Sequence, residues 1–468
     1  MYLFDDVGLM KCPEKHVLMK ELENNLQPDD YVHPKHWPVQ KTAYVIDVMQ
    51  ILRKISTKRM NTFDDFFDKG FDLIISAQCT HASRIDFVFD SYPRGSIKDS
   101  EHEHRNSHNT IEISTIDFDS PLPKDMNTFW SSPHNKRKIQ IASRYWICIH
   151  SESHFNDIKL FLSATAVTED YNQQCNIVND GIAEMYEELS FSHIEEADVR
   201  IIPHVLDSIH SDKCQRVVVM SNDTDVAVLC IHFFKTMQYC AQFGELWIRG
   251  GIGESVRYIP IHTLAIRMGW PLCEVLPAMH ALTRCNTISK VGTKPAALKA
   301  NPAAYLKDFG RSVADVQCME KAEYLVQVVK HGTPLKTMDE VRYNVYHRSK
   351  NSTYCDLPPT SRSLQTHILR AMYSTHMQIN CLQNPNLDPT EFGFEYQDEL
   401  LLPIKNKQLL PNDLPQTCLC NKCATMRCSC RKMNITCCMY CKCTGESFDS
   451  KCKNPNTVLK LHVNVPQT

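Results

Sequence analysis

A dense group of cysteines lies near the C-terminal end of the sequence and holds ten of its 22 cysteines. Their spacing is C-x-C-x2-C-x4-C-x-C-x6-CC-x2-C-x-C-x8-C, with few large aliphatic side chains between them. Such a segment cannot bury a hydrophobic core, so either disulfides or a bound metal must stabilise it. The cysteines are Cys418, Cys420, Cys423, Cys428, Cys430, Cys437, Cys438, Cys441, Cys443 and Cys452.

These thiols are expected to bind zinc rather than to form disulfides. The first residues, MYLFDDVGLMKCPEKH, lack the basic and then apolar layout of a secretory signal, so we expect an intracellular, reducing environment. Thiolates at C-x-C and C-x2-C spacing can converge on tetrahedral Zn2+ or bridge neighbouring ions. Zn2+ is therefore the predicted structural cofactor.

The pattern Cys428-Ser-Cys430, six residues, Cys437, three residues, Cys441-Lys-Cys443 resembles the repeat of the tesmin-like CXC domain. Members of that family use nine cysteines to hold a small cluster of zinc ions and present the module to DNA. The resemblance implies one spare thiol, which we expect to be Cys438. The implied zinc ligands are Cys418, Cys420, Cys423, Cys428, Cys430, Cys437, Cys441, Cys443 and Cys452.

Basic residues alternate with these thiols, as contact with nucleic-acid phosphates requires. Arg427, Arg431 and Lys432 are the predicted DNA contacts of the module. The chain departs from the family at Arg427, where members usually carry a tyrosine. The alternative interpretation is a zinc module that binds a protein partner.

Acidic residues recur where β-rich runs are predicted to end. TAYVIDVM contains Asp47, RIDFVFD ends at Asp90, and RVVVMS precedes Asp223 and Asp225. Helical stretches separate these runs, and this alternation predicts an α/β fold with a mostly parallel sheet and flanking helices. The carboxyl ends of parallel strands meet at one edge of a sheet, so these acids are expected to line one crevice.

Carboxylates gathered at one edge repel one another, and a divalent cation is the usual way to neutralise them. Mg2+ or Mn2+ is the predicted cofactor of this site. Two such ions about 4 Å apart can activate a water and stabilise the leaving oxygen when a phosphodiester is cut. The pattern therefore predicts a metal-dependent nuclease.

The segments YVIDVMQILRKI, FVFDSYPRGSIKDSEHEHR, EEADVR and VVMSNDTDVAVL, in this order, resemble the flap-endonuclease branch of the PIN nuclease fold. MHALTRCNTISKVGTKPAAL is similar to the helix and the DNA-backbone turn of that family. In this stretch Asn286 stands where family members carry an aspartate, and its carbonyl oxygen remains a potential ligand. The metal-binding acids implied by the resemblance are Asp47, Asp90, Glu196, Asp198, Asp223 and Asp225.

The same resemblance implies contacts with DNA. Lys98 and Arg105 are expected to offset charge on the scissile phosphate, and Lys290 and Lys294 belong to the expected DNA-backbone turn. Because Asn286 removes one carboxylate, the alternative is a catalytically impaired, transposon-derived or chromatin-associated protein that binds DNA and keeps the nuclease fold as a scaffold.

The predicted organisation places one large domain ahead of a tethered zinc module. The run LLPIKNKQLLPNDLPQT contains three prolines and no cysteine, which is typical of a linker. The predicted parts are an N-terminal extension at 1–40, a PIN-like domain at 41–310, a helical extension at 311–399, a linker at 400–417, the CXC module at 418–455 and a tail at 456–468.

Composition adds few restrictions. A net charge of -3 and a hydrophobic content of 43% suit a soluble globular protein and argue neither for nor against nucleic acid. The most apolar run, Val226 to Phe234, is far shorter than the ~20 residues of a membrane span, so no membrane partner is expected. With DNA as the expected partner, we predict a nuclear location and leave the oligomeric state open.

Two local features carry their own predictions. Pro203 lies inside the helix expected after Asp198 and is predicted to kink that helix or to end its first segment. Gly250, Gly251 and Gly253 stand between two β-rich runs, which predicts a hairpin turn rather than a phosphate-binding loop.

Overall fold

The structure is a computed structural model, and contacts within it divide the chain into two compact units. The first comprises residues 1–334 and 364–404, and the second comprises residues 335–363 and 405–468. The residues that the structure describes are 16–72, 74–75, 79, 81–91, 112–166, 172–240, 242–251, 256–283, 291–311, 315–332, 337–348, 357–397, 400–405, 418–437, 441–443 and 452–457.

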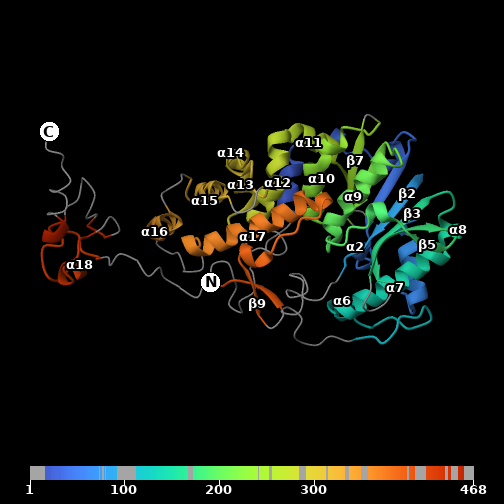
Figure 1. Ribbon diagram of the computed structural model, residues 1–468, viewed down its shortest axis with the longest axis horizontal. Helices are drawn as coiled ribbons and strands as arrows, with labels where there is room; N and C mark the ends of the chain where they lie inside the picture. The colour runs from blue at the N-terminus through green and yellow to red at the C-terminus, as the bar shows by residue number, and fades with distance from the viewer. Residues whose placement is uncertain are drawn as a thin grey trace. The chain divides into compact units, whose positions relative to one another are not determined.

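An eight-stranded sheet with helices on its faces forms the centre of the first unit (Figure 1). The strand order is β5-β4-β3-β2-β1-β6-β7-β8. The strands are β1 (Thr42–Asp47), β2 (Ala82–Val88), β3 (Lys159–Ala166), β4 (Asn172–Asn179), β5 (Ile182–Met185), β6 (Arg216–Met220), β7 (Glu245–Gly250) and β8 (Arg257–Pro260).

The five central strands, from β3 to β7 in the sheet, are parallel. Strands β4 and β5 at one edge and β8 at the other are antiparallel to their neighbours. From β1 the chain builds β2 and β3 on one side and later β6 and β7 on the other. The strand order therefore reverses between β1 and β6, and in open α/β sheets ligands commonly bind at the carboxyl ends of strands beside such a reversal.

The central strands are largely buried on both faces, as expected for parallel strands covered by helices. Every residue of β1 and of β6 is buried. One face packs against an aromatic cluster that includes Phe63, Phe67 and Trp146. These rings come from α3 (Phe63–Phe66), the turn that follows it, and α7 (Pro133–Ile149).

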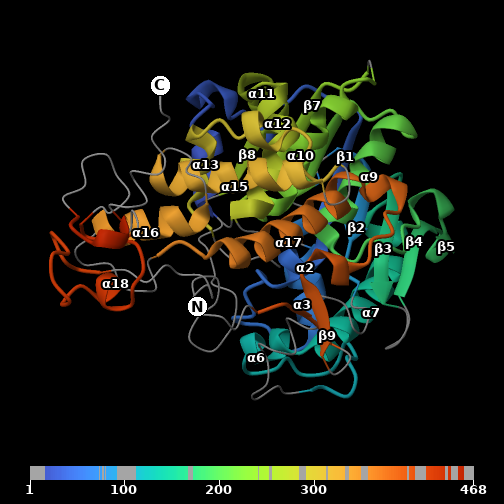
Figure 2. The same ribbon diagram turned by 60° about the vertical axis from the view of Figure 1, so that its left-hand side comes forward.

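Helix α9 (Ala197–His210) lies against β1, β2 and β6, and α10 (Thr224–Met237) packs between α9 and α12 (Trp270–Thr283), as Figure 2 shows. The other helices are α1 (His16–Glu23), α2 (Val48–Leu52), α6 (Met126–Ser131), α8 (Ser151–His154), α11 (Ile261–Met268), α13 (Lys294–Lys299), α14 (Ala303–Leu306), α15 (Val316–His331), α16 (Met338–Arg348), α17 (Ser361–Ile379) and α18 (Ser429–Lys432). A separate two-stranded sheet pairs β9 (Phe394–Gln397) with β10 (Leu400–Pro403).

The predicted mixed α/β class with a mostly parallel sheet is confirmed, and three predicted β-rich runs form the adjacent strands β2, β1 and β6. The predicted hairpin is present, because β7 and β8 pair antiparallel with Gly250 opposite Arg257. The expectation that Pro203 would end the first part of its helix is wrong, since α9 continues through Pro203 to His210. Proline removes one backbone donor, and the burial of this helix on the sheet outweighs that loss.

No helix among the described residues combines the length and the apolar character that a bilayer span needs.

Candidate metal centres

Three aspartates converge at the carboxyl edge of the sheet, where the strand order reverses. Asp198, Asp223 and Asp225 each place one carboxylate oxygen within 4.8 Å of the other two. We call these three residues the acidic cluster. Asp198 lies in the first turn of α9, while Asp223 is the N-cap of α10 and accepts a hydrogen bond from the Asp225 amide at 3.0 Å. Two helix N-termini thus point their partial positive charge at the cluster.

The carboxyl group of Asp198 is held among like charges. Burial raises its pKa well above the usual range, and the neighbouring carboxylates of Asp223 and Asp225 raise that pKa further. Asp47 and Glu196 act in the same direction with smaller effects. Four of the other five predicted acids therefore act electrostatically on Asp198, and a divalent cation would relieve the repulsion.

Two predicted acids also cap helices beside the cluster. Asp47, at the end of β1, is 7% exposed and accepts a hydrogen bond from the Gln50 amide of α2 at 3.0 Å. Asp90 follows β2 and accepts a hydrogen bond from the amide of Ala197, the first residue of α9, at 2.9 Å. Both carboxylates thus fix the helices that begin at the edge where the acidic cluster lies.

A buried histidine and lysine support Asp225. His280 Nε2 of α12 lies 2.5 Å from Asp225 Oδ1, and Lys294 Nζ lies 2.8 Å from His280 Nδ1. An ammonium group only donates, so Nδ1 accepts and Nε2 carries the proton that it donates to Asp225. All three side chains are at most 5% exposed. The DNA contact of Lys294 stays a prediction, and in the structure its side chain is buried against His280.

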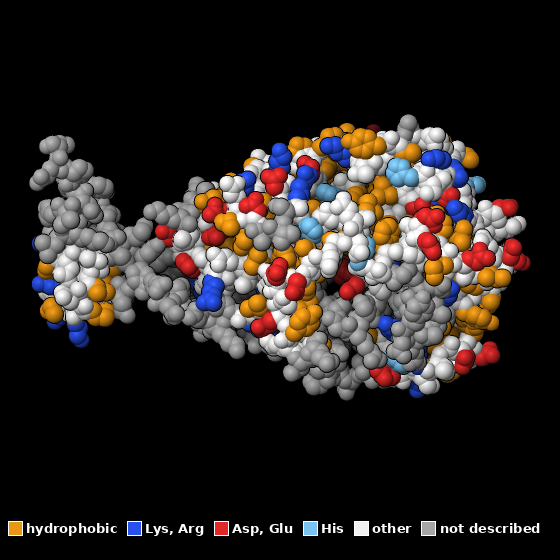
Figure 3. Space-filling model, viewed as in Figure 1, with side chains coloured by type: hydrophobic (Ala, Val, Ile, Leu, Met, Phe, Trp, Pro, Cys, Tyr) orange, Lys and Arg blue, Asp and Glu red, His pale blue; other side chains and the backbone are white. Residues whose placement is uncertain are grey.

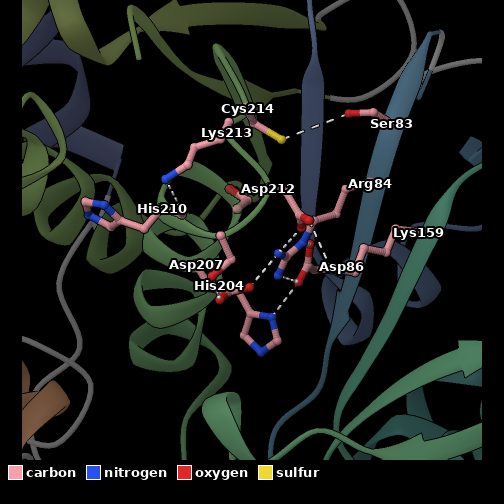
Figure 4. A network of polar contacts seen from close by, with 12 residues as sticks. Ser83, Arg84, Asp86, Lys159, His204, Asp207, His210, Asp212, Lys213 and Cys214 are labelled. Carbon is pink, nitrogen blue, oxygen red and sulfur yellow. Dashed lines mark hydrogen bonds and ion pairs between the residues drawn. The ribbon is translucent and has the colours of Figure 1, made fainter. Parts of the chain in front are cut away.

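Helix α9 is anchored at its far end by a buried ion-pair network (Figure 4). Arg84 of β2 lies 2.7 Å from Asp86 and 2.6 Å from Asp212, and it also pairs with Asp207 of α9. His204 of α9 contacts Asp86 at 2.6 Å. Burial lowers the pKa of Arg84, but the carboxylates, Asp86 foremost, outweigh burial and raise that pKa.

The two ends of α9 are therefore tied to the same strand. Asp90, just after β2, holds its first residue, and Arg84 near the start of β2 holds its last turns. Because a helix is stiff along its axis, these two attachments fix where Asp198 sits relative to β6 and Asp223. The network of Figure 4 thus positions a member of the acidic cluster without touching it.

In the second unit the predicted zinc ligands come together as a compact group of thiols, which we call the cysteine module (residues 418–457). Closest approaches between sulfur atoms include 3.3 Å for Cys418 and Cys423 and 3.6 Å for Cys430 and Cys441. Three overlapping sets of four thiols have their sulfur atoms within 4.8 Å, and Cys418 belongs to all of them. The sets are Cys418, Cys430, Cys437, Cys441; Cys418, Cys420, Cys423, Cys428; and Cys418, Cys423, Cys437, Cys443.

Eight of the nine predicted ligands thus fall into sets that are able to hold a metal such as zinc. The ninth, Cys452, is buried and its sulfur accepts a hydrogen bond from the Asn454 amide at 3.4 Å. The expected spare thiol, Cys438, lies outside the described residues. Sets that share members are what a cluster of ions with bridging thiolates requires.

The thiols of the module differ in acidity. Burial raises the pKa of Cys418 to about 12. Burial also acts to raise the pKa of Cys437, but hydrogen bonds from Asn454 and from neighbouring thiols outweigh it and lower that pKa to about 6. Asn454 Nδ2 lies 3.2 Å from the Cys437 sulfur. Cys437 is thus the thiol best prepared to meet an incoming cation as a thiolate, and a bound cation would deprotonate the others.

The described surface of the cysteine module is basic. Its described residues include Lys and Arg but neither Asp nor Glu. In Figure 3 Lys and Arg side chains lie beside hydrophobic ones on this module, where Leu419 and Met426 are exposed. Of the predicted DNA contacts, Arg427 and Lys432 are exposed, while Arg431 is partly buried and hydrogen-bonded to the Ala424 carbonyl.

Several predicted site residues lie outside the described part of the chain. They are Lys98, Arg105, Asn286 and Lys290. The sequence prediction missed His280 as the partner of Asp225, because His280 lies 55 positions away along the chain and only the packing of α10 on α12 joins the two residues. It also missed the contact of Lys294 with His280.

A scan against protein-family models gave no match, and a search of curated proteins gave none either.

Proposed function

We propose that this chain is a DNA-associated protein whose first unit is a PIN-like, metal-dependent nuclease that hydrolyses phosphodiesters. The observation that carries the proposal is the convergence of Asp198, Asp223 and Asp225 at the reversal point of a parallel sheet. A divalent cation would relieve the electrostatic repulsion in this cluster, and carboxylate oxygens are the ligands that Mg2+ and Mn2+ prefer.

The donor set fits divalent cations, which would be held by the acidic cluster with Asp47 and Glu196 beside it. When bound, they supply charge stabilisation at the phosphoryl oxygens and acidify water. The side chains of the chain orient this site. His280 fixes the direction of the Asp225 carboxylate, and Lys294 in turn contacts His280.

We further propose that the cysteine module is a zinc-stabilised, CXC-like element that supplies affinity for DNA. The overlapping thiol sets support zinc, and the basic described surface supports contact with phosphates. A nuclear location follows from this proposal. The exposed Leu419 and Met426 favour a second candidate role for the module, binding of a protein partner.

Cleavage of flap, hairpin and single-stranded DNA in Mn2+ tests the nuclease. The double variant Asp223→Asn/Asp225→Asn should lose at least about a hundredfold in rate, because it removes two of the charges that hold the cation. Asp64→Asn, at an exposed acid of α3, is the matched control and should cleave like wild type. Equal cleavage by wild type and the double variant would remove the enzyme proposal.

A DNA-binding scaffold without catalysis is the competing function. It is favoured by Asn286, which stands where the resembling family has an acid, and by the engagement of Asp225 with His280. The scaffold predicts that wild type binds DNA as tightly as the double variant and that neither cleaves it. Binding and cleavage measured on the same preparations separate the two functions.

A further inference from the structure

Two cationic side chains lie near each other at the sheet edge that carries the acidic cluster. Arg249 is the penultimate residue of β7, in register with Met220 at the end of β6, and it is 7% exposed. Lys54, just after α2, is half-buried. Burial and then repulsion from Arg249 lower the pKa of Lys54 to about 8, whereas Asp47 acts in the opposite direction.

A chain of hydrogen bonds links the side chain of Lys54 to the segments that follow β6 and β7. Lys54 Nζ donates to Gln50 Oε1 at 3.0 Å, and the same oxygen accepts from the Asn222 amide just after β6. Asn222 Oδ1 in turn accepts from the amide of Gly251, just after β7, at 2.7 Å. The ammonium group of Lys54 is therefore tied to the segments that follow β6 and β7, near Asp47 at the end of β1.

These cations have unmet electrostatic and hydrogen-bonding demands. In the part of the chain that the structure describes, neither Lys54 nor Arg249 forms an ion pair with a carboxylate. The Nε of Arg249 is buried and lacks a hydrogen-bond partner, while its guanidinium also interacts with the Tyr258 hydroxyl. Holding two like charges together in a partly buried place is costly, and an anion that reaches the half-exposed Lys54 would offset that cost.

We propose that Lys54, with Arg249 behind it, binds a phosphate group of a nucleic-acid strand next to the phosphate held at the acidic cluster. This inference rests on the proposed nuclease function and deepens it, because it assigns the nucleic-acid strand a path along the edge of the sheet. Opposite charges at neighbouring positions suit a polyanion with one phosphate on a divalent cation and the next on fixed side chains. Lys54 is then a substrate-positioning residue.

The test pairs protein variants with a set of DNA substrates. Each substrate carries one neutral methylphosphonate at a different position around the cleaved bond, and cleavage by the full chain is followed in Mn2+. For wild type, a methylphosphonate at one flanking position should raise KM about tenfold, because the substrate then loses one charge-assisted phosphate contact. In Lys54→Ala that position should no longer matter, while Lys54→Arg should restore the effect.

Lys235→Ala is the matched control, because Lys235 is exposed in the last turn of α10, about 15 Å along that helix from Asp225. It should keep the wild-type dependence on methylphosphonate position. If Lys54→Ala also keeps the dependence on methylphosphonate position, the proposed phosphate contact of Lys54 is wrong, while the nuclease proposal is unaffected. If wild type cleaves none of the substrates, the proposed function fails and this inference fails with it.

Discussion

At the scale of the residue, Asp198 links the candidate metal site to the stability of the fold. Burial, and then the carboxylates of Asp223 and Asp225, raise the pKa of Asp198 well above its usual range. A carboxyl group whose pKa is higher in the folded than in the unfolded state stabilises the fold below its unfolded pKa. That contribution is lost as the pH rises toward the folded pKa.

In the presence of a metal chelator, the midpoint of thermal unfolding of wild type should therefore fall as the pH rises from about 4 toward neutrality. Asp198→Asn removes the ionisation and should show a flatter dependence on pH. Added Mn2+ should raise the midpoint of wild type at neutral pH more than that of the variant. Thermal unfolding monitored by circular dichroism measures all three effects, and parallel pH curves for the two proteins would contradict this account.

His280 and Lys294 make contacts that the sequence alone does not reveal. Asp47, Asp223 and Asp225 were predictable, because β-rich runs are local patterns that place acids at one edge, whereas Asp198 was named only from the family resemblance. The His280 contact with Asp225 depends on how two helices pack, which no spacing records. Lys294 was assigned to DNA from a local resemblance, whereas its burial against His280 is a tertiary property.

At the scale of the element, α9 shows how a helix with an internal proline serves as a rigid support. Pro203 removes one backbone hydrogen bond, yet α9 runs from Ala197 to His210. Sequence reasoning overestimated the effect of Pro203, because it counted the local loss and not the attachments at both ends. Asp90 holds the first residue of the helix, and Arg84 holds Asp207 near its last turn.

Arg84→Met should lower the free energy of unfolding by about 3–5 kcal/mol, because it leaves buried Asp86 without its cation. Urea denaturation measures this loss. The comparison variant is Lys69→Met, which breaks an exposed pair with Asp65 and should leave stability nearly unchanged. Similar small losses in both variants would show that the buried network does not anchor α9.

At the scale of the whole molecule, two kinds of centre are built by two different means. The acidic cluster is gathered by a hydrophobic fold, whereas the cysteine module has mainly thiols in its interior. The local density of thiols made a cluster able to hold a metal predictable from sequence alone. The identity of its ions and of its partner is a matter of chemistry that the spacing of thiols leaves open.

Metal removal should separate the two centres. Purified protein should contain about two or three zinc ions per chain, and a strong chelator should release them and unfold the cysteine module. DNA affinity should then fall, while cleavage after re-addition of Mn2+ persists at higher substrate concentration. Elemental analysis and binding assays on one sample test this, and a full set of disulfides in place of zinc would contradict it.

The acids at the reversal point come from three segments that are far apart along the chain, at Asp47, Asp198 and Asp223. No one of these segments contains all of the acids that an ion at this edge would contact. Under the proposed function, Mn2+ would bind at this edge only in correctly folded molecules, so titrating a preparation with the ion would measure its native fraction. Measuring Mn2+ uptake over time would also follow refolding, without any substrate.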